Sequence, residues 1–180
     1  MTTPSNQPSE PSERELLLRV AKCPADVRAW AEAEGFANMK EHVDSAAVMA
    51  SQAATTLTVL LAGLGGSLAF AVKVFEPSPG AVAWGAAALC GYLAVLSAVL
   101  VLRNISLEVA QMQHNQPGSL LLPNATLEQL RMGELVNLEL RIRHQTAFNN
   151  RRAAALNQVR WAVIASPLVF AAAAALAKML

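Results

Sequence analysis

The chain has 180 residues, of which 54% are hydrophobic and only 15% are charged, whereas soluble domains average about 45–50% and about 25%. Its net charge of +1 gives no overall reason to expect nucleic-acid binding, and its two cysteines are too few for a disulfide scaffold. The composition therefore argues against a nucleic-acid-binding protein and against a disulfide-rich protein. It leaves a surplus of apolar surface that has to be buried.

The first residues, 1–11, are rich in proline and small polar side chains, which offer nothing to pack. We therefore predict a disordered tail over residues 1–11. The same stretch lacks the basic start and the apolar run of a cleavable signal peptide.

Helix-starting patterns follow this tail. Ser12-Glu-Arg-Glu15 is a capping box, in which the serine hydroxyl and the glutamate carboxylate each satisfy a backbone N–H at the start of a helix. Pro24 suits the first turn of a second short helix that ends at Gly35. Asn38-Met-Lys-Glu41 repeats the capping pattern and starts a third helix. Residues 12–45 are thus expected to form cytoplasmic N-terminal helices.

Two uncharged apolar runs come next, at 46–72 and 81–102. Both reach the ~20 residues that a helix needs to cross a bilayer, and the first exceeds that length, so its membrane part is expected to begin near Ala53. Two prolines and a glycine in the 73–80 segment end one helix and permit a reversal. Residues 46–103 are therefore predicted to form a transmembrane hairpin.

A third apolar run fills residues 161–180 and is bracketed by Arg160 and Lys178, with Trp161 at its entry. Basic and tryptophan side chains are typical anchors at the edges of a membrane span. Pro167 would kink this helix without forbidding it. The fold predicted is an all-α integral membrane protein with three transmembrane helices, a hairpin plus one, and a cytoplasmic helical portion.

Basic residues predict the orientation. Residues 103–160 carry seven arginines, whereas the 73–80 turn contains one lysine. Basic segments stay on the cytoplasmic side. We therefore expect a protein of the bacterial inner membrane, with segment 104–160 and the N-terminus in the cytoplasm and the C-terminus outside. The glycosylation patterns at Asn104 and Asn124 are then chance matches.

Within the 104–160 segment, the second membrane helix is expected to persist to about Met112, until Asn115-Gln-Pro-Gly118 breaks it. Thr126-Leu-Glu-Gln129 is a capping box and opens the last helix. Because no proline follows until Pro167, this helix is predicted to run from about residue 126 into the third span as one rod.

Apolar residues occupy heptad a and d positions at both ends of this long helix: Leu135, Leu138, Ile142, Leu156 and Val159. Gln145, Asn149 and Arg152 interrupt the seam between them. Gln145 and Asn149 either line a polar centre formed by several copies, or they set register or face solvent. The second interpretation is the simpler one.

Four arginines are candidate ligands for a phosphate group or a lipid headgroup because guanidinium groups bind phosphate through paired hydrogen bonds. They are Arg141, Arg143, Arg151 and Arg152. The topology rule and attraction to anionic headgroups explain the same arginines more simply. Few aromatic side chains accompany them, which argues against single-stranded nucleic acid.

Small residues in the hairpin predict close helix packing, as in other membrane helices. The candidates are Ala62, Gly63, Gly65, Gly66, Ala87 and Gly91. Thr55 and Thr58 add a hydroxyl-bearing face to the first span, which suits either helix–helix hydrogen bonds or a pore lining. No ionisable side chain lies deep in a span, which argues against a proton-coupled transporter.

No catalytic pattern is present. The three histidines are scattered and no zinc-protease, paired-cysteine or nucleotide-loop motif occurs. We therefore predict neither an enzyme nor a metal or cofactor site.

The stretches MASQAATTLTVLLAGLGG and NNRRAAALNQVRWAVIASPL, together with the order of the helices over about residues 45–180, resemble small bacterial membrane effectors. These include the SLATT and Pycsar-type transmembrane effectors of anti-phage defence. The resemblance implies a protein that senses a nucleotide signal and then compromises the membrane, but it assigns no residue.

Two functions remain open. One is an oligomeric effector or pore-forming protein in the lipid bilayer, which responds to a nucleotide ligand or a cytoplasmic protein through its cytoplasmic helices. The other is a non-catalytic membrane anchor or accessory subunit that docks a partner protein. A phage holin is a further alternative, for which the large cytoplasmic part is unusual. Membrane permeability after induced expression separates the second from the others.

Overall fold

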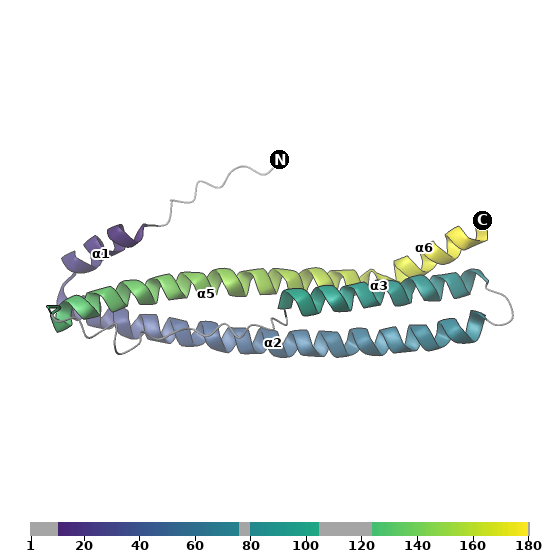
Figure 1. Cartoon of the computed structure of the whole chain (residues 1–180), viewed down its shortest axis with the longest axis horizontal. Coiled ribbons are helices and arrows are strands. Elements are labelled where there is room, and N and C mark those ends of the chain that lie inside the picture. The colour runs from purple at the N-terminus through teal and green to yellow at the C-terminus, as the bar shows by residue number, and fades with distance from the viewer. Residues whose placement is uncertain (1–10, 76–79, 105–123, 180) are drawn as a thin grey trace. The chain divides into compact units, whose positions relative to one another are not determined.

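The computed structural model describes residues 11–75, 80–104 and 124–179, and these ranges contain helices without a strand. In chain order the helices are α1 (Glu13–Lys22), α2 (Ala25–Phe75), α3 (Ala81–Asn104), α5 (Leu127–Ile164) and α6 (Ser166–Met179), as Figure 1 shows. The all-α prediction is confirmed. The predictions made for most of the N-terminal tail, for a helix reaching Met112 and for its break at 115–118 lie outside the described residues.

Both capping boxes predicted for the ends of 12–22 and 126–164 are confirmed. At α1, the Ser12 N–H donates to a carboxylate oxygen of Glu15 at 2.8 Å, and the Glu15 N–H donates to the Ser12 hydroxyl at 3.4 Å. At α5, the Thr126 N–H donates to the Gln129 side chain at 2.9 Å, and the Gln129 N–H donates back to the Thr126 hydroxyl at 3.2 Å. Reciprocal bonds of this kind begin a helix because they satisfy N–H groups that no carbonyl reaches.

The predicted subdivision of the second helix was wrong. The chain neither ends a helix at Gly35 nor restarts one at Asn38, because α2 runs without a break from Ala25 to Phe75. A Cβ atom built on Gly35 would lie 2.6 Å from a methyl group of Leu138 on α5. The glycine therefore makes room for a neighbouring helix, and tertiary packing overrides its weak helix propensity.

The helix predicted from about residue 126 enters the third apolar run without a break, since α5 continues past Trp161, and the bend lies beyond it, at Pro167. Helix α5 ends at Ile164, α6 begins at Ser166, and the two axes are bent by 45°. Pro167 has no N–H to give to the carbonyl four residues earlier, and its ring crowds that turn, so the helix breaks where the proline enters it. The kink expected from Pro167 is thus confirmed.

Helices α2 and α3 are long and apolar enough to cross a membrane, and α5 with α6 makes a third candidate span if the bent pair counts as one. Helix α2 ends at Phe75 and α3 begins at Ala81, within the segment where the prolines predicted the reversal. The apolar helices are therefore compatible with a membrane location, as the sequence predicts.

The chain divides into two compact units, which we describe separately. Unit 1 comprises Met1–Val43 and Ala110–Ala147, and unit 2 comprises Asp44–Val109 and Phe148–Leu180. Helices α2 and α5 contribute one part to each unit.

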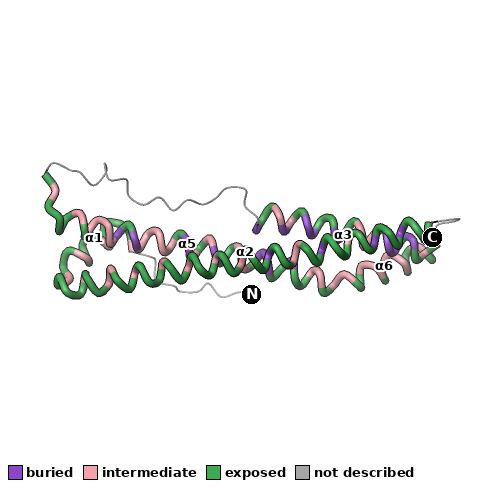
Figure 2. Tube along the Cα trace, turned by 90° about the horizontal axis from the view of Figure 1, so that it is seen from below, coloured by how far each residue is buried: buried purple, intermediate pink, exposed green. Residues whose placement is uncertain are grey.

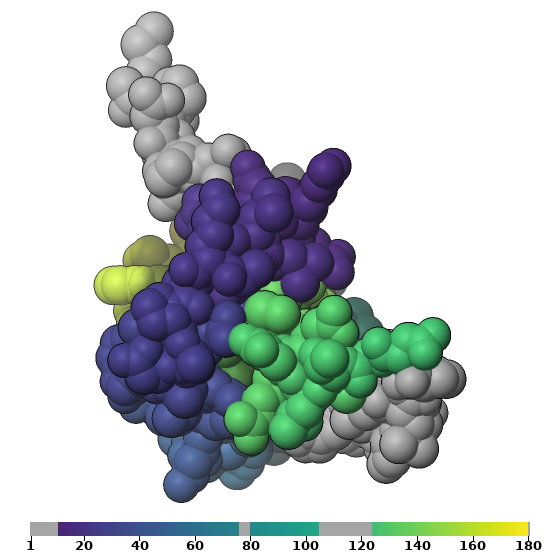
Figure 3. Space-filling view, turned by 90° about the vertical axis from the view of Figure 1, so that its left-hand side faces the viewer, coloured from purple at the N-terminus to yellow at the C-terminus, as the bar shows by residue number. Residues whose placement is uncertain are grey.

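In unit 1 the first parts of α2 and α5 run parallel. Arg28 contacts Glu128 and Met132, and further along both helices His42 contacts Thr146. Val136 and Leu138 of α5 are the buried apolar side chains among the described residues of this unit. The space-filling view in Figure 3 shows α1 and the start of α2, in purple, lying against the start of α5, in green.

Unit 2 is a bundle in which α3 runs opposite to its neighbours. The ring of Phe75 at the end of α2 meets Trp84 at the start of α3, with 5.8 Å between ring centres. The Tyr92 hydroxyl of α3 donates to the Ala162 carbonyl of α5 at 2.9 Å. Figure 2 shows buried turns along α3. The core residues come from α2, α3 and α5: Ala53, Leu60, Leu93, Leu96, Leu100, Leu156 and Val159.

Candidate functional surfaces

The four candidate arginines have different surroundings. In unit 1, Arg141 pairs with Glu134 on the preceding turns. Arg143 bonds Glu139 at 2.8 Å and the Pro11 carbonyl at 3.0 Å. Arg143 therefore links α5 to the chain just before α1, Arg141 pairs within α5, and the charges of both are already balanced by carboxylates.

The other two candidates belong to unit 2. Arg152 lies over the ring of Phe148, with its guanidinium carbon 4.2 Å from the ring centre, which is the geometry of a cation–π contact. Arg151 forms no ion pair within the described ranges and lines a cavity of about 350 Å³. Arg151 and Arg152 are adjacent in the sequence, but their side chains make different contacts in the structure.

The cavity beside Arg151 lies between the last turn of α3 and one face of α5. Its described lining residues are Arg103, Arg151, Ala154, Ala155 and Gln158. The Arg103 guanidinium donates to the Gln158 amide oxygen at 3.2 Å. In the sequence Arg103 marks only the edge of a span. Arg151 and Gln158 fall seven residues apart, so the sequence alone places them on one helix face.

The predicted small residues divide into two groups. A Cβ on Gly63 would lie 3.3 Å from Leu93, so this glycine adjoins α3 although it is exposed. Gly65, Gly66 and Gly91 have nothing within 4 Å of such an atom. Ala62 is exposed as well, and Ala87 is half-buried. Gly85 of α3 has the closest neighbours of the glycines in this unit: an added Cβ would lie 3.0 Å from the Phe170 carbonyl of α6.

Helix α2 presents two opposite faces in unit 2. One face packs in the core through Ala53, Leu60 and Ala71. On the other side, small side chains recur every three or four residues, and all are exposed: Ser51, Thr55, Thr58, Ala62, Gly65 and Ala69. We call these six residues the small-residue face of α2.

The predicted polar lining is likewise divided. The hydroxyls of Thr55 and Thr58 donate to backbone carbonyls four residues earlier, at 3.0 Å each, so both side chains are satisfied while exposed. Gln145 and Asn149 are 7% and 6% exposed, so both amides are buried within the single chain. The hydroxyls therefore lie on the outer surface of unit 2, and the amides do not.

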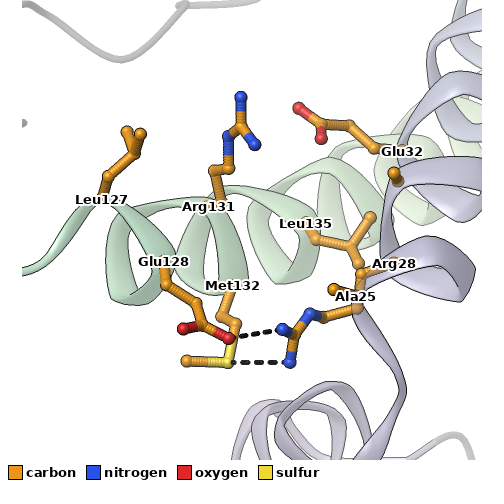
Figure 4. A pocket seen from close by; sticks show the side chains of 9 residues that line it. Ala25, Arg28, Glu32, Leu127, Glu128, Arg131, Met132 and Leu135 are labelled. Carbon is orange, nitrogen blue, oxygen red and sulfur yellow. Dashed lines mark hydrogen bonds and ion pairs between the residues drawn. The ribbon is translucent and has the colours of Figure 1, made fainter.

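Unit 1 contains a second cavity, of about 400 Å³, between the starts of α2 and α5. In Figure 4, Arg28 reaches from α2 to Glu128 and to the sulfur of Met132, and the Arg28–Glu128 pair is 2.5 Å long. Arg131 and Glu32 project on the other side of this cavity. Two basic and two acidic side chains line it, so it has no net preference for an anion.

Among the described residues, the carboxylate of Glu15 has a pKa that differs from its ordinary value. The pKa of Glu15 lies below its ordinary value, chiefly because the Ser12 N–H and then the Ser12 hydroxyl bond its carboxylate. This effect belongs to the cap of α1 and not to a reactive site.

Among residues 11–75, 80–104 and 124–179, no group of three His, Cys, Asp or Glu side chains is placed to hold a metal ion. No protein-family model, curated protein or solved structure matches this chain.

Proposed function

We propose that this chain is a three-span effector of the bacterial inner membrane whose copies associate through the small-residue face of α2 and thereby permeabilise the membrane. The observation that carries the proposal is this face, which no described residue of the chain covers at Gly65 or at the adjacent Gly66. In this proposal the N-terminus and unit 1 are cytoplasmic, and the C-terminus is outside.

The bare apolar surface of unit 2 supports membrane insertion. Val59, Leu61 and Leu68 of α2 are each more than half exposed, as is Leu168 of α6, which is 71% exposed. A water-soluble chain rarely leaves a contiguous apolar surface of this kind uncovered. Lipid would cover it without any further protein.

The chemistry of the small-residue face supports self-association. In lipid, apolar side chains gain nothing by leaving one apolar medium for another, so helices associate where small residues let their backbones approach. The face combines glycine and alanine with hydroxyls, and large apolar residues flank it. A second copy offers an identical face, so two copies are complementary without any other partner.

The test replaces both uncovered glycines with leucine, as Gly65→Leu with Gly66→Leu. Each leucine fills open space in the single chain, so the fold of one copy is retained while close approach of a second is blocked. We expect the oligomer to be lost on light scattering in detergent, and depolarisation after induction to be lost with it. Ala171→Leu with Ala172→Leu, at exposed positions of α6, is the matched control and should change neither.

Depolarisation by a variant that keeps the wild-type oligomer would contradict the role of this face. A monomeric wild-type chain in several detergents and in lipid discs would contradict self-association itself.

A membrane anchor that docks a partner protein is the second candidate. Unit 1 favours it, because Trp30 and Leu18 are 66% and 55% exposed and Val27 is 43% exposed. Aromatic and aliphatic anchors of this kind are typical of protein interfaces. Under this alternative, induction of the chain leaves the membrane potential unchanged, whether Gly65 is glycine or leucine.

A further inference from the structure

The cavity between α3 and α5 in unit 2 lies where the polar and apolar parts of that unit meet. Arg160 of α5 donates to the Gln52 side chain of α2 at 3.2 Å, and Arg103 of α3 donates to Gln158 of α5, also at 3.2 Å. Beyond Gln52, the next 20 residues of α2 are uncharged up to Lys73. That length is about 30 Å of helix, the thickness of a hydrocarbon core.

Unit 2 has more basic than acidic side chains. Its sequence contains six lysines and arginines against three carboxylate side chains, those of Asp44, Glu76 and Glu108. In unit 1, by contrast, Arg28, Arg141 and Arg143 each pair with a glutamate. Arg103 and Arg151 form no ion pair with any described residue, so the described part of the chain does not balance their charges.

The lining of this cavity fits a phosphate group. Two guanidinium groups and one amide line it, and the other described lining residues, Ala154 and Ala155, are small, so none of the described lining residues is a carboxylate. Guanidinium donors arranged as a fork match the paired oxygens of a phosphate better than a lysine would. A volume of about 350 Å³ is enough for a phosphodiester headgroup.

We propose that Arg103 and Arg151, with Gln158, form a phosphate-binding site that bridges the end of α3 and one face of α5. The bound phosphate comes either from an anionic lipid headgroup or from a free phosphate compound in the cytoplasm. The site rests on the membrane insertion proposed above, but it does not require self-association.

The test uses the full-length protein in dodecyl maltoside, with phosphatidylglycerol, phosphatidylcholine and inorganic phosphate as separate probes. Binding is measured by the rise in Tm with probe concentration and by native mass spectrometry of retained lipid. We expect phosphatidylglycerol to bind at least tenfold more tightly than phosphatidylcholine if a headgroup occupies the site. Binding of inorganic phosphate in the lipid-free sample identifies the free compound instead.

Arg151→Gln is the informative variant because Arg151 makes no hydrogen bond or ion pair within the described ranges, so its loss leaves the contacts of the fold intact. We expect it to weaken the preferred probe at least tenfold, and Arg103→Gln to do the same. Arg151→Lys keeps the charge without the fork and should fall between. Arg160→Gln, which removes an arginine with a partner outside the cavity, is the matched control and should bind as the wild type does.

Wild-type affinity in Arg151→Gln, or an equal loss in Arg160→Gln, would overturn the site and leave only a general attraction of basic residues. Absence of binding by all three probes would overturn it as well. Light scattering on the same samples reports the oligomer, so a failure of self-association is recognised separately.

Discussion

Unit 1 and unit 2 use parts of the same two helices, α2 and α5, but different groups hold them together. In unit 1 the Arg28–Glu128 pair joins α2 to α5, two further arginine–glutamate pairs lie within α5, and the buried apolar side chains in its described residues are two from α5. In unit 2 a cluster of leucine, alanine and valine fills the core.

This difference shows how one helix adapts to two surroundings. Ion pairs at the surface of two packed helices are compatible with water, which solvates the exposed parts of the charged side chains. Small residues and leucine suit lipid, where helices gain stability from close packing rather than from leaving water. The sequence of α2 changes from one composition to the other near the boundary at Val43 and Asp44.

The largest expected effect is the loss of stability when a buried leucine of unit 1 is shortened. Leu138→Ala removes a side chain that is 2% exposed, and we expect it to lower the free energy of unfolding of unit 1 by about 3 kcal/mol, as for other buried leucines in water. Under the proposed membrane insertion, Leu60→Ala in unit 2 should cost less, about 1–2 kcal/mol, because lipid would solvate the side chain in the unfolded state as well. Hydrogen exchange resolved by segment measures both, and equal costs would contradict the lipid surroundings of unit 2.

Two glycines of α3 sharpen the account of packing in unit 2. In Gly85→Ala the new methyl group meets the Phe170 carbonyl and the Ala174 side chain, so α6 has to move, at a cost of about 1–3 kcal/mol. Gly91→Ala meets no atom within 4 Å and should stabilise the helix by up to about 1 kcal/mol. Thermal unfolding in detergent compares the pair. A loss of stability in Gly91→Ala alone would mean that its open side touches another copy.

Much of the fold could be predicted because its signals are local. Capping boxes at Ser12 and Thr126 are short-range patterns, and the apolar runs of α2 and α3 need only length and composition to be recognised. The error at Gly35 had a different origin. A glycine that ends a helix and a glycine that accommodates Leu138 from a helix about a hundred residues away have the same local sequence.

The candidate sites were less predictable, since they depend on which side chains meet. Arg141 and Arg151 are equivalent in a basic stretch, yet one has Glu134 as its partner and the other faces a cavity with Arg103. The approach of α3 to α5 that makes this cavity is a long-range contact. No spacing within either helix reveals it.

Removing an ion pair of unit 1 is expected to have a smaller effect on stability, and it tests the difference between the two units. The Arg28–Glu128 pair is 17% and 66% exposed on its two sides, so Glu128→Gln should cost no more than about 1 kcal/mol. The cost should shrink as NaCl screens the charges. A variant in unit 2, Arg160→Gln, breaks only a hydrogen bond to Gln52 and should show less salt dependence. Equal salt dependence in both would contradict the assignment of ion pairs to unit 1.

The smallest expected effect is on the pH dependence of α1. Because hydrogen bonds from Ser12 lower the pKa of Glu15 in the folded helix, the cap stabilises α1 above the ordinary pKa of 4.5, and that contribution is lost as the pH falls through the lowered value. Ser12→Ala removes the hydroxyl and leaves the backbone N–H, which is the larger cause, so part of the pKa shift should persist. Carboxyl NMR titration of Glu15 measures this directly, with Glu13→Gln as a control for the lost charge. A complete return to the ordinary pKa in Ser12→Ala would mean that the backbone bond cannot hold without the hydroxyl, and that the two halves of the capping box form together.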